Sequence, residues 1–209
     1  RDRYGAKNPQ RWHAHAGGRQ VVLVVGQVEK DASIAWGACD VRTNLGLLQA
    51  VRALRPDAWL VYKPHPDVVA GLRGKGEGEA RAGAICDEML LAGSMHDLLE
   101  QVDEVHVMTS LTGFEALLRA RPVVCWGHPF YAGWGLTQDR QPHARRTRRL
   151  SLDELVAGAL IRYPVYCSAA TGKRCTPEQG LEELLRWRER QPVGDPWWRR
   201  WVRPLIARP

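Results

Sequence analysis

The sequence predicts an α/β fold, a doubly wound Rossmann-like parallel sheet followed by C-terminal helices. Short apolar runs rich in β-branched residues recur along the chain, as is typical of strands buried on both faces. Segments with helical start signals and helical apolar spacing lie between them, at steps of roughly 25–40 residues, as βαβ units require. The chain has 209 residues, enough to bury a sizeable core. We expect four or five strands.

The first predicted strand is residues 21–25, Val-Val-Leu-Val-Val, and a loop follows over residues 26–34. Thr43 has a side chain suited to capping a helix, and the apolar residues after it predict a helix that Pro56 ends. Residues 58–62 are the second predicted strand. The Lys-Pro-His-Pro sequence that comes next is held stiff and away from helix by its two prolines.

The middle of the chain repeats this alternation. Residues 71–83 are rich in glycine and charge and predict a mobile surface loop, and residues 84–86 predict a short strand. Ser94 is placed to cap the next helix. Residues 104–118 then combine an apolar strand, the polar turn Thr109-Ser110 and an amphipathic helix, and residues 122–126 predict a further strand.

The last part of the chain predicts a loop and then helices. Residues 127–136 form an aromatic, glycine-rich loop. Ser151 with Glu154 fits a capping box for a helix that reaches about residue 163, and Thr176 with Gln179 begins another. The predicted division is a linker or tail over residues 1–20, a Rossmann-like domain over 21–175, and C-terminal helices over 176–209.

Charge and cysteine usage narrow the class of protein. The formal net charge is +7, so solvated basic faces or an acidic partner such as a phosphate, a nucleotide or a membrane surface are expected. The five cysteines include no CxxC pair, which fits a reducing cytoplasm and predicts no metal site. Cys86 and Cys125 are expected to be small core residues. The sequence contains neither a signal peptide nor a run of 18 apolar residues, so we predict no secretion and no membrane span.

The loops after the predicted strands are the expected site, because ligands of open α/β sheets bind at the carboxyl ends of the strands. Neither the dinucleotide fingerprint nor a P-loop is present, which argues against a standard site of either kind. The polar and aromatic candidates in four loops are Gln27 and Asp31, Lys63 and His65, Thr109 and Ser110, and the segment from Gly127 to Gly135.

Each candidate has more than one interpretation. Asp31 could be a general base, a nucleophile or a turn residue, and His65 could contact a phosphate, protonate a leaving group or be structural. Thr109 and Ser110 could bind phosphate oxygens, cap the following helix, or do both. Glu115 fits a capping box with Thr112. The aromatic residues of the last loop could stack on a base or sugar, or pack as a hydrophobic plug: Phe130, Tyr131 and Trp134.

Four sequence segments, in this order, resemble the bacterial capsule polysaccharide biosynthesis proteins of the KpsC type. They are Gly-Gln-x-x-x-Asp-x-Ser at 26–33, Lys-Pro-His-Pro at 63–66, Thr-Ser-x-x-Gly-Phe-Glu-Ala-Leu at 109–117 and Pro-Phe-Tyr-Ala-Gly-Trp-Gly-Leu-Thr at 129–137. The resemblance extends over residues 21–185 and is strongest to the C-terminal module of two-module members. It implies one half of a GT-B-like, retaining β-Kdo glycosyltransferase that uses CMP-β-Kdo, with no other cofactor, to build the Kdo linker of lipid-linked capsular polysaccharide.

The resemblance also implies roles for individual residues. Asp31 matches the catalytic carboxylate, a nucleophile that forms a covalent Kdo adduct, and His65 matches a His-Pro motif that meets the CMP phosphate. Thr109 and Ser110 match a hydroxyl pair at that phosphate. Glu115 matches an acidic residue near the ribose. The expected donor-binding set is Gln27, Ser33, Lys63, His65, Thr109, Ser110, Glu115, Tyr131 and Trp134.

A GT-B enzyme needs two Rossmann-like domains, and the sequence predicts one. The partners expected are therefore CMP-Kdo, a lipid-linked glycan acceptor, and an absent N-terminal domain or a second chain. The alternative is a non-catalytic fragment or interaction module that keeps the CMP-binding fold. No RNA-binding motif is present, so we predict no nucleic-acid partner. The tryptophans and arginines of residues 196–206 suit either the inner-membrane surface of a cytoplasmic protein or packing on the absent domain.

Overall fold

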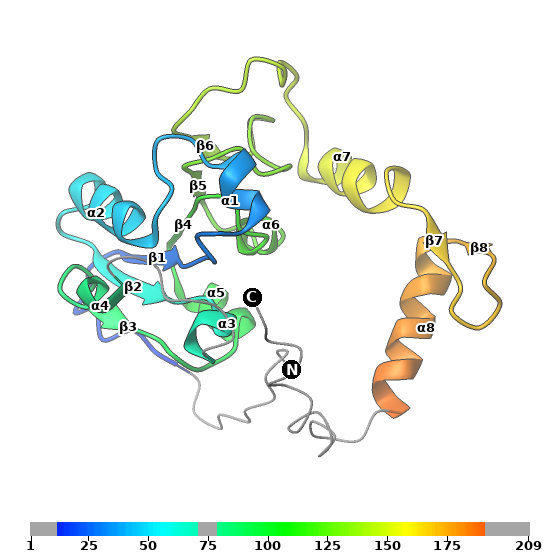
Figure 1. Cartoon of the computed structure of the whole chain (residues 1–209), viewed down its shortest axis with the longest axis horizontal. Helices are drawn as coiled ribbons and strands as arrows, with labels where there is room; N and C mark the ends of the chain where they lie inside the picture. Colours follow the sequence, from blue (N-terminus) through cyan, green and yellow to red (C-terminus); the bar gives the residue numbers. More distant parts are fainter. Residues whose placement is uncertain (1–11, 71–78, 191–209) are drawn as a thin grey trace. The chain divides into compact units, whose positions relative to one another are not determined.

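The computed structural model describes residues 12–70 and 79–190, which fall into two compact units divided between Leu150 and Ser151 (Figure 1). This division comes earlier than the boundary at residue 175 expected from the sequence. The segment 196–206, with its proposed membrane or domain contact, lies outside the described residues, and so does most of the loop expected at 71–83. Among the described residues, no helix is both long and apolar enough to cross a membrane.

The first unit is built on a six-stranded sheet in which every pairing is parallel. The strand order is β3-β2-β1-β4-β5-β6, the doubly wound Rossmann order, and confirms the predicted fold class. The chain moves outward from β1 to one side and then returns to place β4 on the other side, so β1 and β4 flank the switch point. The strands are β1 (Val21–Val25), β2 (Trp59–Lys63), β3 (Glu88–Met89), β4 (Glu104–Val107), β5 (Val123–Cys125) and β6 (Gln138–Asp139).

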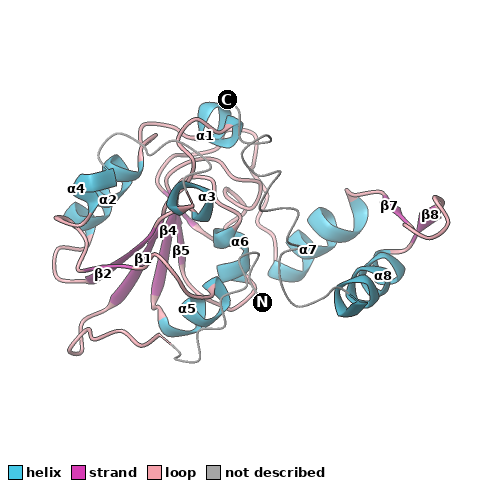
Figure 2. Cartoon of the chain, turned by 60° about the horizontal axis from the view of Figure 1, so that its bottom comes forward, coloured by secondary structure: helices cyan, strands magenta, loops and turns pink. Residues whose placement is uncertain are grey.

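Helices cover both faces of this sheet (Figure 2). The helices α2 and α4 lie on one face, and α5 and α6 lie on the other. The apolar side chains of β1, β2 and β4 are almost all buried between these layers, which explains their continuous apolar runs. The helices of this unit are α1 (Ala32–Gly37), α2 (Asn44–Leu54), α3 (Pro66–Val69), α4 (Glu79–Ala82), α5 (Met95–Gln101) and α6 (Thr112–Leu117).

The helix predicted between Thr43 and Pro56 is confirmed as α2. The Thr43 hydroxyl accepts a hydrogen bond from the Gly46 amide at 3.0 Å, and the helix ends at Leu54, two residues before Pro56. Ser94 occupies the N-cap position of α5, but its side chain makes no cap hydrogen bond. The loop predicted at 26–34 is only partly correct, because the helix α1 begins at Ala32. The sequence did not predict α1, since only Ile34 of this helix is buried and no apolar periodicity results.

The strand predicted at residues 84–86 is wrong. The amides of Ile85 and Cys86 donate to the Ala82 carbonyl at 3.0 and 3.1 Å, so this apolar segment continues the turn of α4. The strand is instead β3, two residues further on, and it begins with Glu88, whose carboxylate accepts from the indoles of Trp12 and Trp59. The expected count of four or five strands is also wrong, because the sheet has six. The additional strand β6 consists of two polar residues, Gln138 and Asp139, so no apolar run predicts it.

Both cysteines expected in the core are there. Cys125 is fully buried in β5, and Cys86 is partly buried and packs against the core. Burial raises the pKa of the Cys125 thiol to about 12. The thiol therefore stays protonated at neutral pH and is a poor nucleophile.

A buried polar network crosses the sheet at β4. The His106 ring is fully buried, and its Nε2 lies 2.6 Å from a carboxylate oxygen of Glu104. The Trp126 indole donates to His106 Nδ1 at 3.0 Å, and Arg55 donates to Glu104 at 3.0 Å. Because an indole N–H can only donate, Nδ1 is an acceptor and the ring is neutral, with its proton on Nε2.

The network should make stability depend on pH. Burial lowers the pKa of His106 despite the hydrogen bond with Glu104. Burial acts to raise the pKa of Glu104, but the bonds from His106 and Arg55 outweigh it and leave that pKa below its ordinary value. Each group therefore binds its proton more readily in the unfolded chain. The stability they provide is present above the unfolded pKa values, 6.5 and 4.5, and is lost as pH falls below them.

We expect the free energy of unfolding to decrease on acidification, starting near pH 6.5. Urea unfolding followed by tryptophan fluorescence at pH 7.5, 6.5, 5.5 and 4.5 measures this dependence. The His106→Gln variant should lose the part of the decrease that begins near pH 6.5. An unchanged pH dependence in that variant would assign the effect to other groups.

The second unit consists of small elements: α7 (Leu152–Val156), the π-helix η1 (Ala157–Arg162), β7 (Tyr166–Cys167), β8 (Arg174–Cys175) and α8 (Pro177–Arg190). The capping box of Ser151 and Glu154 is confirmed, with both hydrogen bonds present. The start signal at Thr176 is confirmed as well, because the Thr176 and Gln179 side chains each accept from the other's amide.

Candidate functional site

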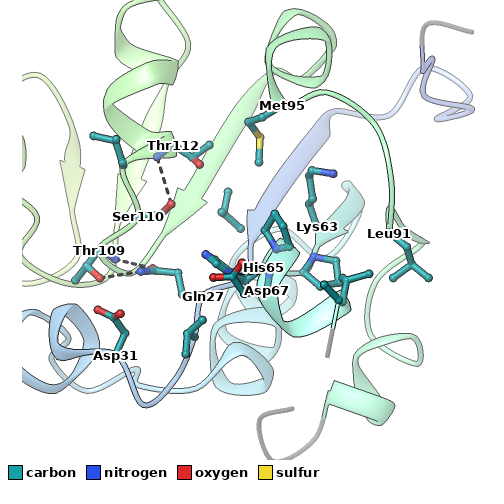
Figure 3. A pocket seen from close by; sticks show the side chains of 18 of the residues that line it. Gln27, Asp31, Lys63, His65, Asp67, Leu91, Met95, Thr109, Ser110 and Thr112 are labelled. Atoms are coloured by element: carbon teal, nitrogen blue, oxygen red, sulfur yellow. Dashed lines mark hydrogen bonds and ion pairs between the residues drawn. The ribbon is translucent and has the colours of Figure 1, made fainter. Parts of the chain in front are cut away.

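A pocket lies at the carboxyl edge of the sheet, where β1, β2, β3 and β4 end (Figure 3). Its volume is about 760 Å³, in the range of sites for small molecules and cofactors. It includes the loops that follow β1 and β4, so it occupies the switch point of the doubly wound sheet, the usual ligand position in such folds.

The structure brings eight of the ten predicted site residues to this pocket. They come from three loops that are far apart in the chain: Gln27, Asp31 and Ser33 after β1, Lys63 and His65 after β2, and Thr109, Ser110 and Glu115 after β4. Tyr131 and Trp134 are the two that do not line it. Thr109 lies 82 residues from Gln27 and the two are hydrogen bonded, so only the folded sheet assembles the site.

Asp31 stands at the N-terminus of α1. One carboxylate oxygen accepts a hydrogen bond from the Ser33 amide at 2.9 Å, which is the geometry of a helix N-cap. The turn interpretation is therefore confirmed. It coexists with a position on the pocket wall, where the exposed carboxylate lies near the Thr109 end of the pocket (Figure 3).

His65 has its tautomer set by the backbone. Its Nδ1 accepts from the Asp67 amide at 3.1 Å at the start of α3. A neutral ring in this arrangement carries its proton on Nε2, so Nε2–H is a hydrogen-bond donor. The Asp67 carboxylate lies 3.9 Å from Nδ1.

Lys63 is buried and turns toward the loop after β3. Its ammonium group donates to the Ala92 carbonyl at 3.3 Å, and its side chain extends away from Thr109 (Figure 3). Lys63 therefore ties two loops of the pocket together. Beside it the pocket wall is apolar, formed by the half-buried Met95 and by the exposed Val69 and Leu91, which sequence reasoning did not identify.

The turn after β4 is held by side-chain hydrogen bonds. The Gln27 amide donates to the Thr109 hydroxyl and accepts from the Thr109 backbone N–H, both at 2.9 Å. The Ser110 hydroxyl accepts from the Thr112 N–H at 3.2 Å. Ser110 thus fills the capping role that the sequence assigned to Thr112.

The capping box of Thr112 and Glu115 is wrong. The helix α6 begins at Thr112 itself, and Leu111 at its N-cap has helical dihedral angles and no side-chain cap bond. Thr112 is already the first residue of the helix, and its backbone N–H donates to the Ser110 hydroxyl. The sequence pattern therefore does not explain Glu115, which is half-buried and lines the pocket.

The aromatic loop packs as a plug behind the site. Tyr131 is fully buried, with its ring centroid 6.2 Å from that of Phe114 and 5.2 Å from that of Phe130. Its hydroxyl donates to the Ser110 carbonyl, and burial raises its pKa so that it remains a donor. Trp134 donates to the Phe130 carbonyl at 2.8 Å and lies against the guanidinium of Arg146.

Sequence reasoning also missed Asn44, the first residue of α2. Its buried side chain exchanges two hydrogen bonds, each of 2.9 Å, with the backbone of Gln27. The backbone N–H of Asn44 donates to the Glu29 carboxylate at 2.7 Å. An asparagine that follows a Thr N-cap was the available signal. In residues 12–70 and 79–190, no group of three His, Cys, Asp or Glu side chains is arranged to hold a metal ion.

The fold and the pocket define a Rossmann-like α/β domain with its ligand site at the switch point of the sheet. The family-level comparison identifies it further. The chain belongs to the capsule polysaccharide biosynthesis protein family, whose model matches residues 6–174. The resemblance drawn from the four sequence segments is confirmed at the level of the family.

Two curated relatives show similar identity. The capsule polysaccharide modification protein LipA of Neisseria meningitidis serogroup B is 47% identical over 173 residues, which are 83% of this chain and 25% of LipA. The lipopolysaccharide-processing protein LpsZ of Rhizobium meliloti is 45% identical over 166 residues, 79% of this chain and 38% of LpsZ. The chain therefore spans a minor part of the length of each.

Two solved structures from Thermosulfurimonas dismutans are also similar. The KpsC β-Kdo 2,7 transferase matches with a TM-score of 0.74 and 48% identity, over 82% of this chain and 54% of that one. The KpsC β-Kdo 2,4 transferase matches with a TM-score of 0.68 and 34% identity, over 80% and 52% respectively. The chain spans about half of each.

Proposed function

We propose that this chain is the donor-binding part of a retaining β-Kdo glycosyltransferase and that its pocket binds CMP-β-Kdo. The observation that carries the proposal is the convergence of Asp31, His65 and the Thr109-Ser110 turn on one pocket at the switch point. The names of the two structural relatives, both Kdo transferases, support the class of reaction.

The polar end of the pocket suits the phosphate of CMP. The transfer leaves CMP with additional negative charge, which positioned hydrogen-bond donors stabilise. His65 Nε2–H and the hydroxyls of Thr109 and Ser110 supply such donors. The apolar end, with Leu91 and Met95, suits the nucleoside.

Asp31 is the proposed nucleophile. Its carboxylate attacks the anomeric carbon of Kdo, the bond from that carbon to the CMP phosphate breaks, and CMP leaves with the electron pair. A hydroxyl of the acceptor then displaces the carboxylate and loses its proton. Two inversions at the same carbon give net retention, and a carboxylate is suited to stabilise the oxocarbenium-like centre in both steps.

The acceptor is proposed to be a lipid-linked glycan at the cytoplasmic face of the inner membrane, bound largely by a second domain. The chain covers only about half of its structural relatives, so the other half is where we place the acceptor contacts. The same partial coverage favours a second candidate function, a module that binds CMP but does not catalyse transfer alone.

Calorimetric titration with CMP tests the donor site. We expect CMP to bind with a dissociation constant below about 1 mM, and Ser110→Ala to weaken binding roughly tenfold because a hydrogen bond to a charged phosphate is lost. Ser94→Ala is the matched control. Ser94 lies in the loop before α5, does not line the pocket, and makes no side-chain cap hydrogen bond, so its removal should not change CMP binding. No binding of CMP by the unmodified chain at millimolar concentration would refute the proposed function. Binding without any reaction of CMP-Kdo would favour the non-catalytic module.

A further inference from the structure

The aromatic loop resembles a segment of the family, yet its two predicted ligand contacts do not reach the pocket. Tyr131 has no exposed surface, and Trp134 bonds within its own loop. The Tyr131 hydroxyl nevertheless contacts the site from behind, because it donates to the carbonyl of Ser110. One hydrogen bond thus connects the buried plug with a residue on the pocket wall.

The residue opposite Tyr131 is small by necessity. A Cβ atom at Gly113 would overlap the Tyr131 hydroxyl and lie only 2.7 Å from its ring. Gly113 therefore lets the tyrosine approach the first turn of α6, where the Gly113 N–H donates to the same Ser110 carbonyl at 3.2 Å. Phe114 and Phe130 pack around the tyrosine ring and fix its direction.

Gln27 holds the other side of the same turn. Both polar groups of its side chain are used by Thr109, one by the hydroxyl and one by the backbone N–H. Gln27 is itself buried, and its backbone is fixed by Asn44. Thr109 and Ser110 are therefore held by side chains from two other loops, one in front of the turn and one behind it (Figure 3 shows the Gln27 side).

We infer that Gln27 and Tyr131 are positioning residues that clamp the Thr109-Ser110 turn in the geometry that receives a phosphate. Tyr131 does not line the pocket, and both polar groups of the Gln27 side chain are already bonded to Thr109. The inference rests on the proposed function, because it assigns the turn to the phosphate of CMP. A clamp of this kind reduces the conformational freedom that binding would otherwise remove, so it raises affinity for the phosphate group and leaves the nucleoside contacts unchanged.

The test compares two ligands on matched variants of the full chain. Tyr131→Phe removes the hydroxyl and keeps the ring, and Gln27→Met removes both bonds to Thr109 at similar size. We expect the affinity for CMP to fall about tenfold in each variant. The affinity for cytidine, which lacks the phosphate and is followed by ligand-observed NMR, should not change. Thr137→Val removes a hydrogen bond to Asp139 in the same loop that does not reach the turn, and it should leave both affinities unchanged.

An unchanged CMP affinity in both variants would overturn the clamp, and so would equal losses for CMP and cytidine, which indicate a general structural defect. Hydrogen exchange of the unliganded chain separates this inference from the proposed function. Tyr131→Phe should speed exchange of the Thr112 and Gly113 amides, both of which donate to Ser110. If the unmodified chain binds no CMP, the proposed function fails, and unchanged exchange rates would refute the clamp independently.

Discussion

Replacing Asp31 by asparagine should lower release of CMP from CMP-β-Kdo at least about 1,000-fold and leave CMP affinity within about twofold of the original. The substitution separates the two roles of the residue. Asparagine keeps the oxygen that accepts from the Ser33 amide, and it is as good an N-cap as aspartate, so α1 should be preserved. It lacks the negative charge and the nucleophilic oxygen that the displacement needs.

Intact-mass spectrometry makes this prediction independent of the acceptor. Incubated with the donor alone, the unmodified chain should gain the mass of one Kdo residue, and Asp31→Asn should gain none. Asp40→Asn is the control, because Asp40 is an exposed carboxylate that bonds to Gln141 and does not line the pocket. An adduct on Asp31→Asn, or an equal loss of CMP binding and CMP release, would rule out Asp31 as the nucleophile.

The second large effect concerns stability. Glu104→Ala should lower the free energy of unfolding by about 3 kcal/mol, the range observed when one partner of a buried ion pair is removed. The loss has two causes. The buried His106 Nε2–H is left without its acceptor, and Arg55 loses a carboxylate that is only 5% exposed.

Urea unfolding of matched variants measures this effect. Glu104→Gln retains an acceptor for His106 without the charge, so its loss should be smaller than that of Glu104→Ala. Glu100→Ala, which breaks an exposed pair with His96, should cost less than about 1 kcal/mol. If Glu104→Ala costs no more than Glu100→Ala, the network at β4 does not contribute to stability in the way described.

The sheet and the position of the site could be predicted because both follow from local patterns. The strands β1, β2, β4 and β5 are buried on both faces and therefore appear as continuous apolar runs. Once these strands are parallel, their carboxyl ends share one edge, which brings Asp31, His65 and Ser110 together. The short elements β3 and β6 lack such runs, because their pairing depends on neighbours and not on their own residues.

The details of the site could not be predicted, since they depend on contacts between distant residues. The Thr112–Glu115 pattern is a valid local signal, but the Ser110 hydroxyl already accepts a hydrogen bond from the Thr112 amide, and the helix starts one residue earlier than that pattern requires. The sequence leaves Tyr131 two roles, stacking on a base or sugar or packing in a hydrophobic plug. Only the fold shows that Gly113 leaves room for it behind the turn. Gln27 lines the pocket as expected, but only the fold shows that its side chain bonds to Thr109.

The strand order has a consequence for how the chain is made. The residues that pair β1 with β4 are separated by about 80 positions, as for Gln27 and Thr109, which lie 82 residues apart. A ribosome adds about 5–20 residues per second, so roughly 4–16 s pass between synthesis of one partner and the other. During that interval the most apolar strand of the chain has one edge without its partner. This nascent edge is where a chaperone would protect the chain, and where mispairing would begin in its absence.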